Sequence, residues 1–361
     1  MALIPGGHLV AKYLKHVENI NTVFALSGGH IEQILDGLTE YKIRAIDVRH
    51  EQAAVMMAHA MSIYTGKPGV CIVTAVILCG RHPLRDDLKG ALQEMNQPDM
   101  VKPVVKWYAT CYDAKRIPEY LGMAFRYATE GRPGPVFLEL PPDIVNIKVE
   151  ENDALMPGRA TKKYMFCASD GDLERAAAII NDAKKPLFIG GSGVRFSNCG
   201  DALAQFVETT GMPFVLLNNG RGELSDTHPL CVWDVGNIGL MVSISQADVI
   251  VLSGIRLNWT LQSGQIIPPD AKVVRIDIDP HEIDRNRAAD VGLVGDAGSV
   301  LAELTSRVAK RGHGEWISTL RAAGRAFIDT ELKLRETPSD PIHPIRLTAQ
   351  IYRAAGDDAL Y

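Results

Sequence analysis

The stretch that decides the fold of this chain is residues 41–75, YKIRAIDVRHEQAAVMMAHAMSIYTGKPGVCIVTA. The run Ile43–Val48 is short, apolar and rich in β-formers, which predicts a buried strand. Gln52–Tyr64 follows without a helix breaker and is rich in Ala and Met, so we expect a helix that begins close to Glu51. A second buried strand is expected over Val70–Thr74. Strand, helix and strand in this order predict an α/β domain with a parallel sheet.

Glu51 stands at the carboxyl end of the first of these strands, beside the first turn of the helix. Open α/β sheets bind their ligands at this edge, so the Glu51 carboxylate is a candidate functional group. The alternative is that it only caps or charges the N-terminus of the helix, where an acidic side chain is mildly stabilising. The spacing alone leaves both roles open.

Length, charge and cysteine spacing limit the classes of function. The 361 residues suffice for two or three domains, and a formal net charge of −5 offers no basic face to nucleic acid or to an anionic membrane. We find no apolar segment long enough to span a bilayer and no signal-like N-terminus, and we expect a cytoplasmic protein. The six cysteines lie far apart without a CxxC pair, which favours reduced thiols over disulfides or a zinc site.

Two passages carry a resemblance to a known family. Residues 48–75 and the run RPGPVFLELPPDI at 132–144 resemble the pyrimidine-binding domain of the thiamine diphosphate enzymes, in the branch with acetolactate synthase, benzaldehyde lyase, 2-hydroxyacyl-CoA lyase and oxalyl-CoA decarboxylase. The resemblance implies several three-layer α/β domains with parallel sheets. These are a pyrimidine-binding domain at 1–150, a Rossmann-like middle domain at 165–310, and a linker with the start of a diphosphate-binding domain at 311–361.

The resemblance implies roles for candidate residues in the first domain. In the superfamily, a glutamate at the position of Glu51 hydrogen-bonds the aminopyrimidine and favours the imino tautomer that deprotonates the thiazolium. Gly28 and Gly29 fall on a loop that borders the substrate space and the cofactor. His30 and Gln97 fall on a histidine and a glutamine that line the benzaldehyde lyase pocket. Without the resemblance, Gly-Gly is an ordinary turn, His30 a neighbour of a helix N-cap and Gln97 a solvated loop residue.

The middle domain offers candidates for nucleotide binding. Gly191 and Gly193 lie in a GGSG turn that resembles a dinucleotide loop but lacks the full GxGxxG spacing. Arg256 either faces a phosphate or forms a salt bridge at a strand end. Asp277 or Asp279 would accept from a ribose hydroxyl, although relatives that bind no nucleotide share this pattern. The choice among ADP, FAD and no nucleotide stays open.

Parts of the family pattern are missing from these residues. Near 75–79 the family continues through a glycine-rich turn, a helix and a strand, whereas here Ala75 leads almost directly into Cys79. By ordinary βαβ dimensions, roughly a helix and most of a strand are absent. The family's magnesium and diphosphate motif lies in its third domain, so we expect no metal ligand among these 361 residues.

The resemblance implies a thiamine diphosphate-dependent lyase or transferase with Mg²⁺ as a second cofactor. Like acetolactate synthase or benzaldehyde lyase, it would make or break a C–C bond next to a carbonyl, in carboligation or cleavage of 2-keto acids or 2-hydroxy ketones. A homodimer or homotetramer is expected, because the family's site lies between subunits. Two alternatives stay open. One is an enzyme that acts on acyl-CoA, like 2-hydroxyacyl-CoA lyase or oxalyl-CoA decarboxylase, and the other is a truncated, non-catalytic binding module.

Overall fold

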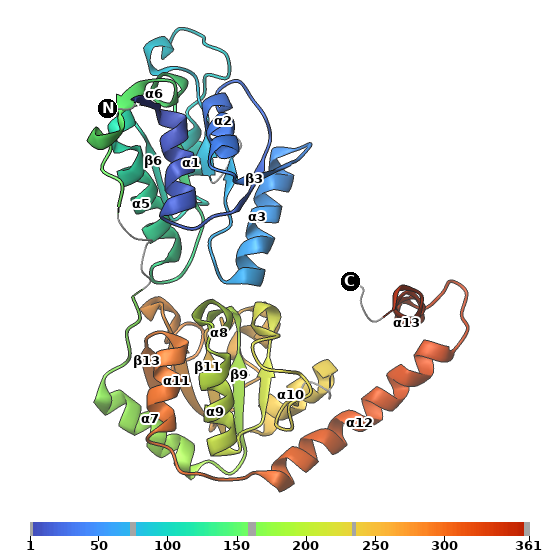
Figure 1. Cartoon of the computed structure of the whole chain (residues 1–361). Coiled ribbons are helices and arrows are strands. Elements are labelled where there is room, and N and C mark those ends of the chain that lie inside the picture. Colours follow the sequence, from blue (N-terminus) through green and yellow to red (C-terminus); the bar gives the residue numbers. More distant parts are fainter. Residues whose placement is uncertain (1–2, 73–76, 158–163, 233–235, 357–361) are drawn as a thin grey trace. The chain divides into compact units, whose positions relative to one another are not determined.

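The computed structural model describes residues 3–72, 77–157, 164–232 and 236–356. The chain divides into two compact units, Met1–Tyr164 and Met165–Tyr361 (Figure 1). Each unit is built on a parallel sheet with helices on both faces, which confirms the predicted α/β fold class. Within the described residues, no helix is long and apolar enough to cross a membrane.

The first unit contains a six-stranded sheet with the order β3-β2-β4-β5-β7-β6. Every neighbouring pair is parallel, so the carboxyl ends of all six strands lie at one edge of the sheet. The strands are β2 (Thr22–Ala25), β3 (Arg44–Asp47), β4 (Cys71–Ile72), β5 (Ile77–Cys79), β6 (Trp107–Thr110) and β7 (Val136–Glu139). A separate antiparallel pair joins β1 (Leu3–Pro5) to β8 (Lys148–Glu150).

Successive side chains of the central strands enter two different cores, because strand side chains alternate between the faces. Leu138 of β7 packs with the core under α1 (Gly6–His16), α2 (Glu32–Glu40), α5 (Ile117–Thr129) and α6 (Pro142–Val145). Its neighbour Phe137 packs with the core under α3 (Glu51–Thr65). Val101 of the short helix α4 (Gln97–Val101) packs against the same core. Burial on both faces explains why these strands read as continuous apolar runs.

The strand expected to be buried at residues 43–48 lies instead at the edge of the sheet, so this prediction of burial was wrong. β3 pairs with β2 alone, and Arg44, Ala45 and Asp47 are exposed. Only the flanking Ile43 and Val48 are buried. A strand with one neighbour has one open side, and local apolar content does not reveal this.

β4 and β5 are parallel neighbours, with Cys71 opposite Ile77 and Ile72 opposite Leu78. Only four positions, 73–76, separate them, and these lie outside the described residues. Parallel neighbours are ordinarily joined by a crossover of a dozen or more residues, and four cannot contain a helix of that kind. The absence of part of the family pattern near residues 75–79 stays a prediction. The strand after these four positions is short but takes its place between β4 and β7.

The second unit has the sheet order β10-β9-β11-β12-β13. Its strands are β9 (Pro186–Gly190), β10 (Phe214–Leu216), β11 (Val249–Ser253), β12 (Lys272–Asp277) and β13 (Val291–Val294). In chain order this is 2-1-3-4-5, a doubly wound, Rossmann-like arrangement whose switch point lies between β9 and β11. The Rossmann-like fold predicted for this part of the chain is therefore confirmed.

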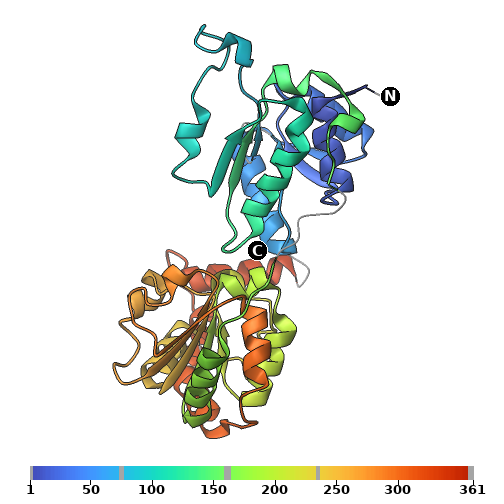
Figure 2. The same ribbon diagram turned by 90° about the vertical axis from the view of Figure 1, so that its left-hand side faces the viewer.

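Helices cover both faces of the second sheet (Figure 2). One face packs against α7 (Asp170–Asp182), α8 (Ser192–Ser197), α9 (Gly200–Thr210) and α11 (Ala297–Thr305). The other packs against α10 (Gly236–Gln246) and the start of the long α12 (Gly314–Glu336), where Trp316 and Leu320 are buried. The last helix, α13 (Pro344–Ala355), has no buried residue among its described positions.

Candidate functional site at the sheet edge of the first unit

Glu51 is the first residue of α3, at the carboxyl edge of the parallel sheet. The N-cap of this helix is His50, whose Nδ1 accepts a hydrogen bond from the Gln52 amide at 3.2 Å. The Glu51 side chain is 42% exposed, and its Oε2 lies 4.0 Å from His50 Nδ1. The capping bond is therefore made by His50, and the carboxylate of Glu51 stays accessible at the edge where such sheets bind ligands.

The turn with Gly28 and Gly29 lies after β2, at the same edge of the sheet. Both glycines are exposed, and a Cβ added at either would meet no atom within 4 Å. Packing inside the unit therefore does not require glycine at these two positions. Open space beside the backbone fits a ligand that approaches this turn closely.

His30 ends this turn and lies against the residue that follows β5. A Cβ built on Gly80 would lie 2.6 Å from the Cβ of His30 and 3.2 Å from a side-chain carbon of Ile31. The close approach requires a glycine at position 80. It also brings the ends of β2 and β5 together around His30, although these strands are not neighbours in the sheet.

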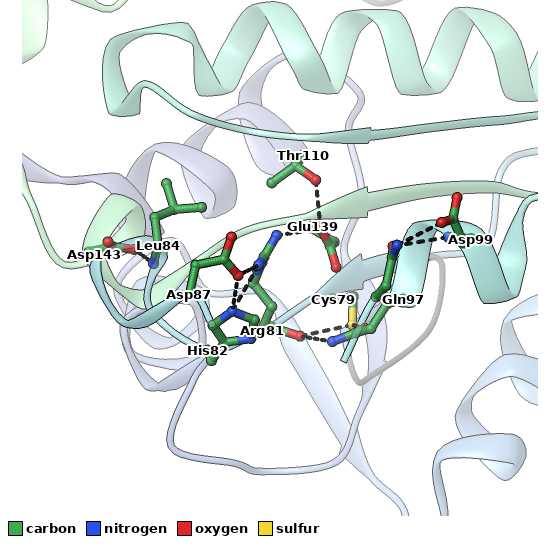
Figure 3. A network of polar contacts seen from close by, with 12 residues as sticks. Cys79, Arg81, His82, Leu84, Asp87, Gln97, Asp99, Thr110, Glu139 and Asp143 are labelled. Atoms are coloured by element: carbon green, nitrogen blue, oxygen red, sulfur yellow. Dashed lines mark hydrogen bonds and ion pairs between the residues drawn. The ribbon is translucent and has the colours of Figure 1, made fainter. Parts of the chain in front are cut away.

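Gln97 is buried, with 6% of its surface exposed, so the alternative of a solvated loop residue was wrong. Its Nε2 donates to the Gly80 carbonyl at 3.1 Å, and its Oε1 accepts from the Cys79 thiol at 2.6 Å (Figure 3). Burial, with Glu139 as the next cause, raises the pKa of the Cys79 thiol, which therefore stays protonated and donates. The amide of Gln97 thus holds the end of β5, and its role in a pocket stays a prediction.

A polar network beside Gln97 was missed in the sequence. Oε2 of Glu139 accepts from Thr110 Oγ1 at 2.6 Å and lies 3.4 Å from Arg81 Nη1 (Figure 3). On the other side of Arg81, Nη2 lies 2.9 Å from Asp87 Oδ1 and 2.9 Å from His82 Nε2. The signal that would have found it is the acidic residue inside the apolar strand VFLEL, since a buried charge needs a partner.

His82, Asp87 and Glu94 offer ligand atoms within 4.8 Å of one another, as a metal site would. Protein groups already engage the two carboxylates of this cluster, because Arg81 donates to Asp87 and the amides of Leu88 and Ala91 donate to Glu94. The hydrogen bond from His82, followed by the charge of Arg81, lowers the pKa of Asp87. These contacts account for the cluster, and we assign no metal to it.

The GGSG turn of the second unit lies at the switch point between β9 and β11. The amide of Gly191 donates to the Ser253 carbonyl at 3.0 Å, and that of Gly193 donates to the Gly254 carbonyl at 2.9 Å. A Cβ at Gly193 would lie 2.4 Å from the Gly254 Cα. These glycines allow two backbones to pack, and their amides are engaged where a phosphate loop would present them to its ligand.

The other nucleotide candidates are also engaged within the second unit. Nε of Arg256 donates to Glu282 Oε1 at 3.0 Å, which is the salt bridge that the sequence left open as the alternative. Burial raises the pKa of Asp277, whose Oδ1 accepts from the Asp279 amide at 3.0 Å. Asp279 caps the next turn by accepting from the His281 amide at 3.0 Å. Ribose binding by either aspartate stays a prediction.

Comparison with known proteins gives matches in both units. The model of the thiamine pyrophosphate enzyme N-terminal TPP binding domain matches residues 4–77, and the model of the central domain matches residues 173–304. Together, 74 and 132 residues are matched, which is more than half of the chain.

Curated relatives agree with these matches. Human 2-hydroxyacyl-CoA lyase 1 is 28% identical over 348 residues, which cover 88% of this chain and 59% of the relative. Oxalyl-CoA decarboxylase of Escherichia coli (strain K12) is 29% identical over 336 residues, with 84% and 58% covered. A probable acetolactate synthase of Mycobacterium bovis is 29% identical over 376 residues, with 98% and 67% covered. The chain thus spans about three fifths of the length of the first two relatives. It belongs to the thiamine pyrophosphate enzymes and carries their N-terminal and central domains.

Proposed function

We propose that this chain supplies the pyrimidine side of a thiamine diphosphate site in an enzyme that makes or breaks a C–C bond next to a carbonyl. The observation that carries the proposal is the position of Glu51, an accessible carboxylate at the ligand edge whose helix is capped by another residue. Gly28 and Gly29 leave open space at the same edge, so the residues present fit the cofactor.

Each residue has a distinct part in this proposal. Thiamine diphosphate supplies, when bound, a nucleophilic thiazolium carbon for attack on a carbonyl. Glu51 shares a proton with a ring nitrogen of the aminopyrimidine and so sets its tautomer. Gly28 and Gly29 let a ligand approach the backbone. His30, held against Gly80, faces the substrate side and donates a hydrogen bond to the carbonyl oxygen.

The substrate of the proposal is a keto acid, a hydroxy ketone or an acyl-CoA, and the relatives' names, which contain acetolactate and acyl-CoA, support these classes. The proposal also includes Mg²⁺ as a second cofactor, because the residues that hold the diphosphate are expected outside the two matched domains. It includes a homodimer or homotetramer, because the family's site lies between subunits. Residues 311–361 would then link to a diphosphate-binding domain. The described cysteines form no disulfide, which fits a reducing compartment such as the cytoplasm. We do not propose ADP or FAD as a cofactor, since the amides of Gly191 and Gly193 donate hydrogen bonds within their own unit.

Titration with thiamine diphosphate, with and without Mg²⁺, tests the proposal by calorimetry. We expect saturable binding by the natural chain and at least a tenfold weaker affinity for Glu51→Gln. Glu32→Gln is the matched control, because Glu32 is also a first-turn glutamate of a helix in this unit and is exposed. It should bind like the natural chain.

Each outcome of this titration decides between the alternatives. Binding by none of the proteins would favour the non-catalytic module. Equal binding by Glu51→Gln and the natural chain would show that Glu51 does not hold the aminopyrimidine. Circular dichroism of each variant shows whether the fold is retained.

A further inference from the structure

Glu139 is a fully buried carboxylate at the carboxyl end of β7, with a side-chain exposure of 0%. Thr110 donates to its Oε2, and Arg81 is the cation that faces the same oxygen. Its Oε1 has no hydrogen-bond partner among the described residues. Burying a carboxylate is costly unless it is paired with a cation and hydrogen-bonded. Glu139 of β7 therefore holds the side chain of Arg81 against the sheet.

Arg81 also holds the segment that follows β5. Its side chain is 12% exposed, and its guanidinium reaches Glu139 with one terminal nitrogen and Asp87 with the other. Asp87 in turn lies 2.7 Å from Nε2 of the buried His82. The planar, rigid fork of an arginine suits such a double contact, whereas a lysine offers a single point charge. One side chain thus joins the sheet to the start of the segment 81–105.

Gly80, next to Arg81, is the point where this segment touches the candidate site. Its carbonyl accepts from Gln97, and its Cα lies so close to His30 that a Cβ would meet the His30 Cβ at 2.6 Å. A shift of Arg81 would move Gly80, because the two are consecutive in the chain. A shift of Gly80 would release or displace His30.

We propose that Arg81 is a positioning residue of this site. By pairing with Glu139 it fixes the Gly80 turn against His30 and holds the segment 81–105 at the ligand edge of the sheet. The catalytic importance of this inference rests on the proposed function. The position of His30 can be measured whether or not the proposed function is correct. An ion pair that served only stability would leave the surroundings of His30 unchanged in a folded variant.

The test compares the imidazole NMR signals of His30 in histidine-labelled proteins, assigned with a His30→Gln variant. Arg81→Met leaves Glu139 without its cation, so the double variant Arg81→Met/Glu139→Gln removes both charges and protects the fold. Arg85→Met is the control, since Arg85 is 75% exposed and belongs to the same segment. We expect displaced His30 signals in the double variant, partial recovery in Arg81→Lys, and natural signals in Arg85→Met.

Hydrogen exchange of the backbone amides gives a second, independent measurement. Exchange over residues 82–105 should be at least tenfold faster in the double variant, while the amides of β9 and β11 provide an internal reference. Unchanged His30 signals together with unchanged exchange in the folded double variant would overturn the proposal. If the natural chain binds no thiamine diphosphate, the proposed function fails, yet displaced His30 signals would still establish the positioning by Arg81.

Discussion

Gly193→Ala is the substitution whose cost follows most directly from the structure. The new Cβ would lie 2.4 Å from the Gly254 Cα, 3.2 Å from its carbonyl oxygen and 3.3 Å from its carbonyl carbon. All three atoms belong to the backbone, so no flexible side chain can yield. The backbones must separate, which also strains the 2.9 Å hydrogen bond from the Gly193 amide to the Gly254 carbonyl.

Overpacking costs about 1–3 kcal/mol and a lost hydrogen bond about 0.5–1.5 kcal/mol, so we expect Gly193→Ala to lower the free energy of unfolding by about 3 kcal/mol. For a unit of this size, that corresponds to a fall in Tm of roughly 6–12 °C, measured by circular dichroism. Gly171→Ala is the control, because a Cβ there meets nothing within 4 Å and Ala favours the helix α7. A loss below about 1 kcal/mol in Gly193→Ala would refute the role of this glycine in backbone packing.

Three further outcomes are expected. Gly29→Ala should change the free energy of unfolding by less than about 0.5 kcal/mol in urea titrations, because its Cβ would enter open space. Iodoacetamide should label Cys167 of the native protein first, as shown by peptide mass spectrometry. That thiol is exposed, whereas burial raises the pKa of Cys71 and of Cys199 to about 12. Burial raises the pKa of Asp277 in the folded state, so this group should lower the stability as the pH rises from 3.8 through the raised pKa. Asp277→Asn should weaken that decline in urea midpoints measured over this range.

These expectations have clear contrary results. A loss above about 1 kcal/mol in Gly29→Ala would mean that the turn needs glycine for its own packing. Labelling of Cys71 as fast as Cys167 would show that the sheet of the first unit opens readily. An unchanged pH dependence in Asp277→Asn would show that other groups control it.

The helix at Glu51–Thr65 was predictable because its signals are local. Nothing between Gln52 and Tyr64 interrupts a helix, and Gly66 ends it in the left-handed conformation with φ 66°. The central strands were predictable for a similar reason, since burial on both faces leaves a continuous apolar run. The edge position of β3 was not predictable, because its exposure depends on which strands lie beside it.

In the candidate site, too, the sequence predicted the local features and not those that depend on tertiary contacts. The position of Glu51 at the ligand edge follows from the order of strand and helix along the chain. The pair of Arg81 and Glu139 joins residues 58 positions apart, and it exists because β5 and β7 are neighbours in the sheet. The burial of Gln97 likewise depends on the packing of α4 on the end of β5, which no local pattern reports.

The exposed strand β3 also bears on how the chain avoids aggregation through the open edge of its sheet. An edge strand with apolar residues on both sides is a template for pairing with foreign strands, and charged side chains on the strand oppose this. Arg44 and Asp47 are exposed on β3, and Arg49, just beyond it, pairs with Asp47 at 2.6 Å. Arg44 and Asp47 stand in a run that is otherwise apolar, Ile43 to Val48. Two residues of the run that was expected to be buried, Arg44 and Asp47, therefore place charges where they oppose pairing with a foreign strand.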